Sequence, residues 1–395
     1  MGIPVIVSAC RTAVGKFQGG LAKLTSPELG VQVAAEALRR GAVGPDQVDE
    51  VIMGCVLQAG LGQAPARQVL RGAGIPDAVG ALTVNKVCGS GLKSVMLAAQ
   101  AIRAGDASCI LAGGMESMSN VPYYLPEARR GHRLGHAQVV DGMIADGLWD
   151  PYHDFHMGNT GELVAKEYGI SREEQDAYAA ESHRRAVAAQ EAGKFTAEIL
   201  PIEVKGRKGA VSVVAADEGP RADSTAESLA KLRPAFQKDG TVTAGNASSI
   251  NDGAAAVVVM DEAAAQAAGA KPLARVLGYA TGGMAPEWVM MAPEVAVKKL
   301  CAQLGCAPQD FDLVELNEAF AVQCVALTRR LELDPQRVNV HGGAVALGHP
   351  IGCSGTRILV TLLHALADRG LQRGLAGLCL GGGNAVVMAV ERIEG

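Results

Sequence analysis

The hydrophobic positions along the chain fall into short apolar runs separated by longer amphipathic segments. The short runs predict buried strands at residues 5–8, 48–53 and 109–112. Between them, apolar residues at helical spacing predict helices at residues 26–40 and 92–102. We expect Ser26 to cap the first helix, with Pro27 in its first turn. This alternation of strands and helices is typical of an α/β fold.

The same order of elements occurs a second time near the C-terminus. In the first copy a Gly/Ser turn and a helix precede strand 109–112, which we expect to end at Gly113-Gly114. In the second copy Gly352-Cys353-Ser354-Gly355 predicts a turn, followed by a helix at 358–369 and a strand at 377–380. The repeat predicts a duplicated α/β domain, with Cys88 and Cys379 on comparable edges of the two copies.

Residues 121–248 differ in composition from the segments on either side. They contain a basic cluster, a long polar helix predicted at 172–191 and a charged turn at 205–208, and the chain returns to an apolar strand at 254–260. We interpret this region as a large insertion into the first copy. The expected domains are an N-terminal half (1–120 plus 249–270), an inserted loop domain (121–248) and a C-terminal half (271–395).

Composition narrows the classes of function. The 395 residues are 49% hydrophobic and 19% charged, which suits a large core, and 49 glycines suit tight turns and close packing. A net charge of −5 argues against general nucleic-acid binding. No apolar run is long enough for a membrane span, and the N-terminus lacks the pattern of a signal peptide. Nine scattered cysteines, with no zinc-like spacing, suit free thiols in the cytoplasm and no metal.

Cys88 is the most informative residue of the chain. It lies between small residues, directly before a predicted helix, so its thiol is expected near a helix N-terminus. Unpaired N–H groups there favour negative charge, and we expect them to lower the pKa of the thiol and to activate it as a nucleophile. From this segment alone, a buried structural cysteine in a tight turn is an equally good interpretation.

Three further segments change this balance: Asn317-Glu318-Ala319-Phe320, the glycine-rich stretch around His349, and Leu378-Cys379-Leu380 with its following glycines. Each has a plain alternative, because Asn317 could cap a helix that begins at Glu318, His349 could be an exposed loop residue and Cys379 could be strand core. Together with the Cys88 segment, and in this order, they resemble the thiolase family, most closely its biosynthetic acetyl-CoA acetyltransferases.

The resemblance covers essentially the whole chain and implies a fold and a reaction. The fold is a duplicated αβαβα layered core with an inserted loop domain. The reaction is the reversible Claisen condensation of two acetyl-CoA to acetoacetyl-CoA plus CoA, by ping-pong transfer through an acetyl-cysteine. Coenzyme A is then a co-substrate, and no other cofactor is expected. A 3-ketoacyl-CoA thiolase of broader chain length is the alternative.

The resemblance also assigns roles to single residues. Cys88 would attack acyl-CoA, His349 would take its proton, and Cys379 would deprotonate the second acetyl-CoA. Asn317, through a bound water, and His349 would form one oxyanion hole, and the backbone N–H groups of Cys88 and Gly381 the other. The implied substrate-binding residues are Leu148, His156, Met157, Arg221, Ser228, Phe236, Ser248, Met290, Ala319 and Phe320.

Among these residues His156 and Met157 would restrict the acyl pocket to short chains, and Arg221 would lie near the adenine of CoA. Arg221 and Ser228 could equally be ordinary surface residues, and Met157 a buried residue at a helix start. A homodimer or homotetramer formed through the insertion is implied as well. Cys353 is expected to pack in the core. The remaining cysteines are expected to be buried and inert: Cys10, Cys55, Cys109, Cys301, Cys306 and Cys324.

Four other classes of protein fit the sequence less well. A ketoacyl synthase would have histidine or asparagine in place of Cys379, and a cysteine protease would leave the paired CoA-type segments unexplained. A catalytically silent acyl- or lipid-binding protein of the same ancestry would have lost at least one of the four key side chains. A dinucleotide-binding enzyme needs a third glycine where Gly60-x-Gly62-x-x-Pro65 has proline.

Overall fold

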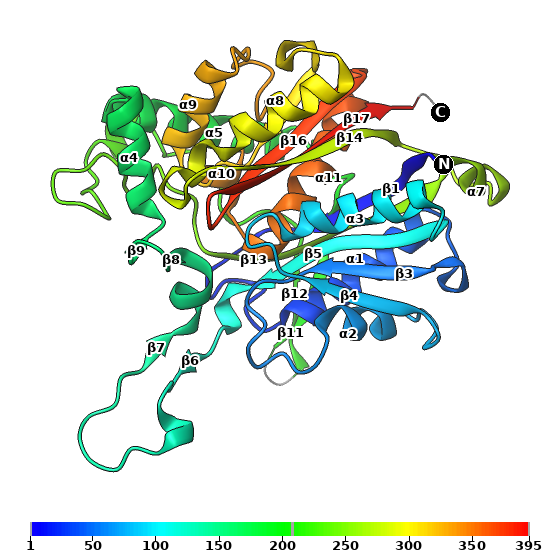
Figure 1. The fold of residues 1–395 in the computed structure, drawn as a ribbon, viewed down its shortest axis with the longest axis horizontal. Helices are drawn as coiled ribbons and strands as arrows, with labels where there is room; N and C mark the ends of the chain where they lie inside the picture. The colour runs from blue at the N-terminus through cyan, green and yellow to red at the C-terminus, as the bar shows by residue number, and fades with distance from the viewer. Residues whose placement is uncertain (1, 207–208, 394–395) are drawn as a thin grey trace.

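The computed structural model describes residues 2–206 and 209–393, and it has five layers (Figure 1). Two sheets enclose a central pair of helices, α3 (Ser90–Ala104) and α11 (Ile351–Arg369). Helices α1 (Ser26–Arg40) and α2 (Pro65–Gly72) cover the outer face of the first sheet. Helix α8 (Ala292–Leu304) covers the outer face of the second. The layered α/β fold expected from the sequence is confirmed.

The first sheet is built from strands that lie far apart in the chain. Its order is β1 (Pro4–Thr12), β13 (Asn251–Asp261), β5 (Cys109–Ser117), β3 (Glu50–Gly54) and β4 (Gly80–Val84). Strand β13 is antiparallel to both of its neighbours, whereas β5, β3 and β4 are parallel. Almost all residues of β1, β5 and β13 are buried, as expected for strands covered by helices on both faces.

The second sheet repeats this order, which confirms the duplication. Its strands are β14 (Ala274–Gly283), β17 (Asn384–Arg392), β16 (Arg373–Leu380) and β15 (Leu313–Leu316). Strand β17 is antiparallel between β14 and β16, as β13 is between β1 and β5, and β15 is parallel to β16. Strands β1 and β14 pair briefly and join the two sheets.

The start of α1 corrects one prediction. The helix has the predicted bounds, but Thr25 rather than Ser26 is its N-cap. The Thr25 hydroxyl accepts the N–H of Glu28, and the Glu28 carboxylate accepts the backbone N–H of Thr25 at 2.8 Å. A capping box therefore satisfies two donors of the first turn, and Ser26 is its first helical residue.

Glycines in the core permit close packing rather than ending elements. Strand β5 continues through Gly113 and Gly114 to Ser117, so the strand end predicted at these glycines is wrong. A Cβ added to Gly114 would lie 2.1 Å from the carbonyl oxygen of Gly352. Helix α11 begins at Ile351, so Gly352 to Gly355 form its first turn and not the predicted loop. A Cβ on Gly355 would lie 2.4 Å from the backbone nitrogen of Leu92 in α3.

These contacts bring the N-termini of the two central helices together. Cys88 lies two residues before α3, and His349 lies two residues before α11. The residue that corresponds to Cys88 in the second copy is therefore His349. Cys379 instead lies near the end of strand β16, so it does not occupy the place that Cys88 has in the first copy.

Residues between β5 and β13 form the insertion, which covers one side of the core (Figure 1). It contains α4 (Gly158–Tyr168) and α5 (Arg172–Glu191), the latter with its predicted bounds, and the hairpin β11 (Ile202–Lys205) and β12 (Val211–Val214). Residues 207–208 of the predicted charged turn lie outside the described residues. Fully buried Arg11 of β1 holds the insertion through Glu198 at 2.6 Å and Asp217 at 2.7 Å.

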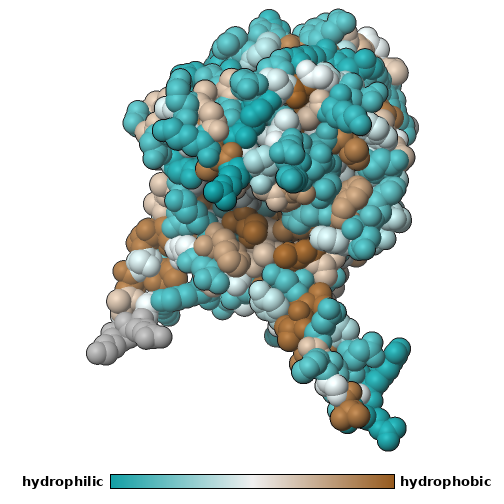
Figure 2. Space-filling view, turned by 90° about the vertical axis from the view of Figure 1, so that its left-hand side faces the viewer, coloured by the Kyte–Doolittle hydropathy of each residue, from teal (hydrophilic) through white to brown (hydrophobic). Residues whose placement is uncertain are grey.

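An arm projects from the insertion, with β6 (Tyr123–Tyr124) and β7 (Val140–Asp141) paired at its base (Figures 1 and 2). It carries apolar side chains into solvent, among them Leu134, which is 100% exposed, and Val139, which is 61% exposed.

Several general properties follow from the described residues. None of their helices is both long and apolar enough to cross a lipid bilayer. Within the same part of the chain, no group of three or more His, Cys, Asp or Glu side chains is arranged to hold a metal ion.

All nine cysteines are free thiols, and Cys353 packs in the core between the sheets. Cys306 is half-buried, so its expected full burial is wrong.

Candidate active site

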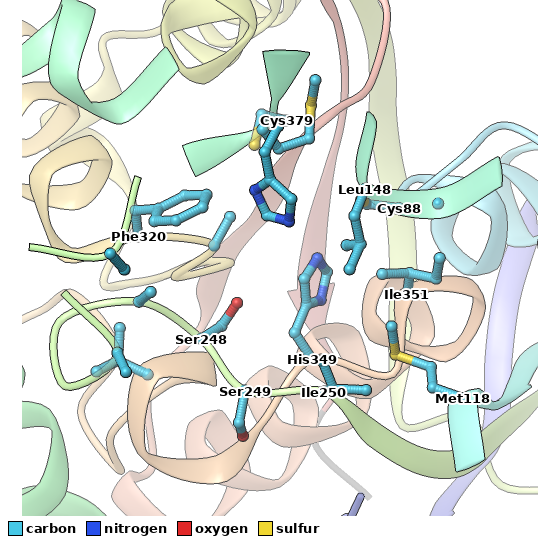
Figure 3. A pocket seen from close by; sticks show the side chains of 18 of the residues that line it. Cys88, Met118, Leu148, Ser248, Ser249, Ile250, Phe320, His349, Ile351 and Cys379 are labelled. Atoms are coloured by element: carbon cyan, nitrogen blue, oxygen red, sulfur yellow. The ribbon is translucent and has the colours of Figure 1, made fainter. Parts of the chain in front are cut away.

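One cavity of about 640 Å³ collects most of the residues singled out from the sequence. It lies where the two halves meet the insertion, and on the face in Figure 2 apolar residues gather in a hollow near the middle. Figure 3 shows the imidazole of His349 pointing into it, with Cys88 and Leu148 on one side and Phe320 and Ser248 across from them. The predicted residues that line it are Cys88, Leu148, His156, Met157, Arg221, Phe236, Ser248, Met290, Ala319, Phe320, His349, Cys379 and Gly381.

Cys88 lies in a strained turn between β4 and α3. Val87 has a φ of 45°, in the left-handed region that β-branched residues rarely adopt. The Ser90 hydroxyl donates to the Val87 carbonyl oxygen at 2.6 Å and accepts the Lys86 N–H at 2.8 Å, which closes the turn. Such strain is characteristic of functional sites, because the surrounding structure must hold it in place.

The pKa of Cys88 is raised, contrary to the expectation from its position before a helix. Desolvation is the largest cause, while the backbone N–H groups of Cys88 and Gly381 act in the opposite direction. These N–H groups therefore lie near the sulfur, but they do not offset the loss of water. The resting thiol keeps its proton, and a base must remove it.

His349 is held in one tautomer by Ser354. The Ser354 hydroxyl donates its single proton to the Pro350 carbonyl oxygen at 2.9 Å, because a carbonyl can only accept. Its oxygen must then accept from His349 Nδ1, 2.6 Å away. Nε2 of the imidazole is left with a free lone pair. Ser354 was not recognised from the sequence, although it lies in the same glycine-rich segment.

Burial keeps this imidazole neutral. Desolvation, with a smaller contribution from the charge of Arg357, lowers the pKa of His349 to about 3. The backbone N–H of His349 donates to Asn251 Oδ1 at 2.9 Å, which fixes the loop. His349 is only 6% exposed, so its interpretation as an exposed loop residue is wrong.

Asn317 lies beside the imidazole but does not line the cavity. Its Nδ2 is 3.4 Å from His349 Nδ1 and 3.5 Å from Nε2, and its buried Oδ1 has no hydrogen-bond partner among the described residues. Its backbone N–H donates to the Gly377 carbonyl oxygen at 3.0 Å, which ties it to β16. The next helix, α9 (Ala321–Arg330), begins after Phe320, so Asn317 does not cap it.

Two buried carboxylates hold the segments around the site. Glu318 accepts hydrogen bonds from the Ser182 hydroxyl at 2.7 Å and from the Val345 N–H at 3.0 Å, which joins the insertion to the His349 loop. Glu116 accepts the N–H of Gly352 at 2.9 Å and that of Leu57 at 3.1 Å, which joins the two halves. Burial raises the pKa of Glu116 to about 7.

Cys379 approaches from the opposite half. It is the last residue but one of β16 and pairs across the sheet with Ala385. Burial raises the pKa of its thiol, and the nearby charge of an ionised Cys88 raises it further. The two sulfurs therefore interact within one cavity, although 290 residues separate them in the chain.

An apolar wall closes the inner part of the cavity. Strands β8 (Trp149–Asp150) and β9 (Phe155–His156) form a small hairpin, so that the Met157 N–H donates to the Leu148 carbonyl oxygen at 2.9 Å. The His156 ring stacks on Phe236 with centroids 4.7 Å apart. Its Nδ1 accepts the Gly158 N–H at 3.1 Å, so Nε2 carries the proton of this neutral, partly buried imidazole.

Ser228 is the predicted binding residue that the structure places away from the cavity. It lies in α6 (Ala226–Leu229), where its hydroxyl donates to backbone carbonyl oxygens at 2.9 to 3.0 Å. The cavity has further lining residues that the sequence did not indicate, among them Lys16, Phe17 and His183. They come from β2 (Gly15–Lys16), the residue after it and α5, and no local motif marks them.

Comparison with known proteins places this site in a family. Models of the thiolase N-terminal and C-terminal domains match residues 4–263 and 270–392. An acetyl-CoA acetyltransferase of Escherichia coli (strain K12) is 57% identical over 99% of each chain, and one of Cupriavidus necator is 56% identical over 98% of this chain and 99% of its own. The crystal structure of the Bacillus anthracis acetyl-CoA acetyltransferase superposes with a TM-score of 0.98 at 45% identity, covering 100% of this chain and 99% of the other.

Proposed function

This chain belongs to the thiolase family, and from that premise we propose that it is an acetyl-CoA C-acetyltransferase. It condenses two acetyl-CoA to acetoacetyl-CoA and CoA, and it catalyses the reverse thiolysis. The observation that carries the proposal is the meeting of Cys88, His349 and Cys379 in one cavity. The names and high identity of the relatives support the choice of acetyl-CoA.

In the first half-reaction Cys88 attacks the thioester carbonyl of acetyl-CoA. His349 Nε2 accepts the thiol proton and passes it to the departing CoA thiolate, which leaves an acetyl group on Cys88. Because the Cys88 thiol and the His349 imidazole are buried, neither a thiolate nor an imidazolium would be stable alone. Formed together, the two opposite charges stabilise each other. The N–H groups of Cys88 and Gly381, which lie near the sulfur, donate to the thioester oxygen as negative charge develops on it.

In the second half-reaction the Cys379 thiol gives its proton to His349 Nε2, and the thiolate removes a proton from the methyl group of another acetyl-CoA. The resulting enolate attacks the acetyl group on Cys88, which forms a carbon–carbon bond and releases the Cys88 sulfur as a thiolate that takes the proton from His349. The enolate oxygen receives hydrogen bonds from His349 and, through a water, from Asn317, whose amide lies beside that imidazole. No cofactor takes part, because every proton moves between side chains and substrate.

The walls of the cavity suit a short acyl chain on a CoA carrier. Phe236 packs edge-on against Phe320 and flat against His156, so large rings occupy the space that a longer acyl tail would need. Ser248 lies along the path of the pantetheine arm, and the cations Lys16 and Arg221 line the cavity with it, a charge that suits the phosphates of CoA. Ser228 stays in the proposal only as a CoA contact outside the cavity.

The proposal extends to the assembly. The arm between β6 and β7 exposes Leu134 and Val139, and the insertion that carries it is the proposed contact between copies in a homodimer or homotetramer. We keep the three expected domains as its organisation: 1–120 plus 249–270, 121–248 and 271–395. The cytoplasm is the proposed location.

Incubation with acetyl-CoA tests the mechanism. Mass spectrometry of the denatured protein and its peptides should find one acetyl group per chain, on Cys88. A protein that stays unmodified, or that is acetylated on another residue, would refute the assigned nucleophile.

Thiolysis rates test the chain length. Acetoacetyl-CoA should be cleaved with a kcat/KM on the order of 100-fold above that of a longer, unbranched 3-ketoacyl-CoA, because the aromatic wall must move for the longer chain. Equal rates would favour the broader 3-ketoacyl-CoA thiolase.

A further inference from the structure

Two cysteines outside the catalytic cavity lie at the C-terminal end of helix α8. Cys301 belongs to the last turn of the helix and is 4% exposed, whereas Cys306 follows the helix and is half-buried. Neither residue lines the cavity that holds Cys88 and Cys379, and the proposed mechanism uses neither. Because both lie at one helix end, they form a pair rather than two isolated thiols.

The backbone at the end of α8 links Cys306 to Cys301. Gly305 ends the helix in the left-handed region, with a φ of 66°, and its N–H donates to the Cys301 carbonyl oxygen. The N–H of Cys306 donates to the same oxygen at 3.0 Å. These bonds form a Schellman motif, in which the first and last residues commonly place their side chains in contact. Here those two residues are Cys301 and Cys306.

This hydrogen bond limits the separation of the two cysteines. A backbone nitrogen lies about 1.5 Å from its Cα and a carbonyl oxygen about 2.4 Å from its own, so a bond of 3.0 Å keeps the two Cα atoms within about 7 Å. Disulfide-linked cysteines have Cα atoms about 4.4–6.8 Å apart. Cys301 also belongs to the apolar cluster beneath α8, and Cys306 packs against that cluster. The two thiols therefore lie on the same side of the chain.

We propose that Cys301 and Cys306 are a modification site, a thiol pair that a peroxide oxidises to an intramolecular disulfide and a small thiol reduces again. Cys306 attacks the O–O bond of the peroxide, which leaves a sulfenic acid on its sulfur and releases an alcohol or water. Cys301 then attacks that sulfur, so that the S–S bond forms, the S–O bond breaks and the hydroxide leaves as water with the Cys301 proton. The O–O bond takes up the two electrons that the sulfurs lose.

Access decides which of the two thiols reacts first. Seven of the nine cysteines are buried, and only Cys88 and Cys306 are half-buried, so Cys306 is the member of the pair that a peroxide reaches. The pKa of Cys301 is raised to about 12, by burial first and then by neighbouring Cys306, so Cys301 is a weak nucleophile by itself. Contact with the Cys306 sulfur compensates, because the second step occurs within one chain.

Peptide mass spectrometry tests the oxidation. The folded full chain is treated with hydrogen peroxide, denatured and labelled with N-ethylmaleimide, and then digested with trypsin. Residues 300–329 leave as one peptide that contains Cys301, Cys306 and Cys324. This peptide should lose two hydrogens and carry a single maleimide, on fully buried Cys324, which is the internal control. Fragment spectra should show no break between residues 301 and 306. A peptide with three maleimides, or a disulfide to Cys324, would overturn the proposal.

Two variants separate the roles of the two thiols. In Cys301→Ala the sulfenic acid of Cys306 has no partner, so its labelling by dimedone should rise about tenfold over the wild type. In Cys306→Ala the thiol of Cys301 should remain free after the same treatment. Equal dimedone labelling of Cys306 in the wild type and in Cys301→Ala would show that no disulfide forms. Circular dichroism before and after treatment checks that each protein stays folded.

Glutathione buffers test the reduction. Two reduced glutathione molecules are consumed for each intramolecular disulfide opened, but one for each mixed disulfide. At a constant ratio of reduced to oxidised glutathione, a tenfold higher total concentration should therefore lower the ratio of disulfide to dithiol tenfold. A ratio that does not change would indicate glutathione bound to Cys306 alone and would contradict the pair. Acetylation of Cys88 enters none of these measurements, so the outcome is independent of the proposed function.

Discussion

Cys88 and His349 occupy the same place in the two halves of the molecule, yet they carry opposite chemistry. Each lies two residues before a central helix, at the N-termini of α3 and α11, and glycines bring these termini into contact. In the proposed mechanism one copy thus supplies a proton donor and nucleophile, and the other supplies its base. A duplicated fold with identical residues at both places would have two thiols or two imidazoles, and neither pair could start the reaction.

Cys379 differs from both. It lies near the end of a strand and, unlike the half-buried Cys88, is buried. The contrast separates two tasks that need the same element, sulfur: attack on a carbonyl, which needs access and a base, and removal of a carbon-bound proton, which needs exclusion of water.

Cys379→Ser should have the largest effect on the difference between the two cysteines. Acetylation of Cys88 should proceed at close to the wild-type rate, while condensation falls on the order of 10⁴-fold, since a serine hydroxyl cannot replace the base. Acetyl transfer is measured by mass spectrometry in single turnover, and condensation by the release of CoA. If condensation survives, the second base is a different group.

His349→Ala should impair both half-reactions, by about 10²- to 10⁴-fold each, because one imidazole serves both. Rapid-quench measurement of Cys88 acetylation and steady-state condensation give the two values. A loss confined to condensation would remove His349 from the first step and leave the Cys88 proton without an acceptor.

Ser354→Ala should slow acetylation of Cys88 by about 10- to 100-fold, because Nδ1 of His349 loses the oxygen that holds its proton there. Nitrogen-15 NMR of the labelled imidazole should show a mixture of tautomers in place of the Nδ1–H form. The tautomer mixture separates this role from a simple loss of packing. A single unchanged tautomer would contradict it.

Gly355→Ala should test the contact of the two helices rather than the chemistry. The added methyl group would meet the Leu92 backbone at 2.4 Å, so the helices must move apart. We expect a loss of about 1–3 kcal/mol in the free energy of unfolding, measured in urea, with slower acetylation of Cys88. Gly80→Ala is the control, since a Cβ there has nothing within 4 Å and should change stability by less than about 0.5 kcal/mol.

The smallest expected effect concerns pH: protonation of His349 should leave no mark on the rate of Cys88 acetylation near neutral pH. The pKa of His349 is lowered to about 3, so acidification leaves the imidazole unprotonated well below its ordinary value near 6.5. The rate of Cys88 acetylation should therefore show no inflection between about pH 5 and 7. An inflection near pH 6.5 that disappears in His349→Ala would show a hydrated, exposed imidazole.

Much of the fold could be predicted from the chain alone. The buried strands, the duplication and the bounds of α1 and α5 followed from apolar periodicity, because burial on one or two faces leaves a direct trace in the residue pattern. The segments around Cys88, Asn317, His349 and Cys379 also indicated the family and its reaction. Their residue types and order are local properties of the sequence.

The tertiary structure decided what depends on neighbours distant in the chain. Only packing shows that Gly114 and Gly355 admit a helix rather than end an element, and that Ser354 sets the tautomer of His349. The sign of the Cys88 pKa shift was wrong when judged from the turn, because desolvation by the assembled cavity exceeds the effect of the local N–H groups. Free energies of hydration are set by everything that surrounds a group, and no stretch of sequence contains that information.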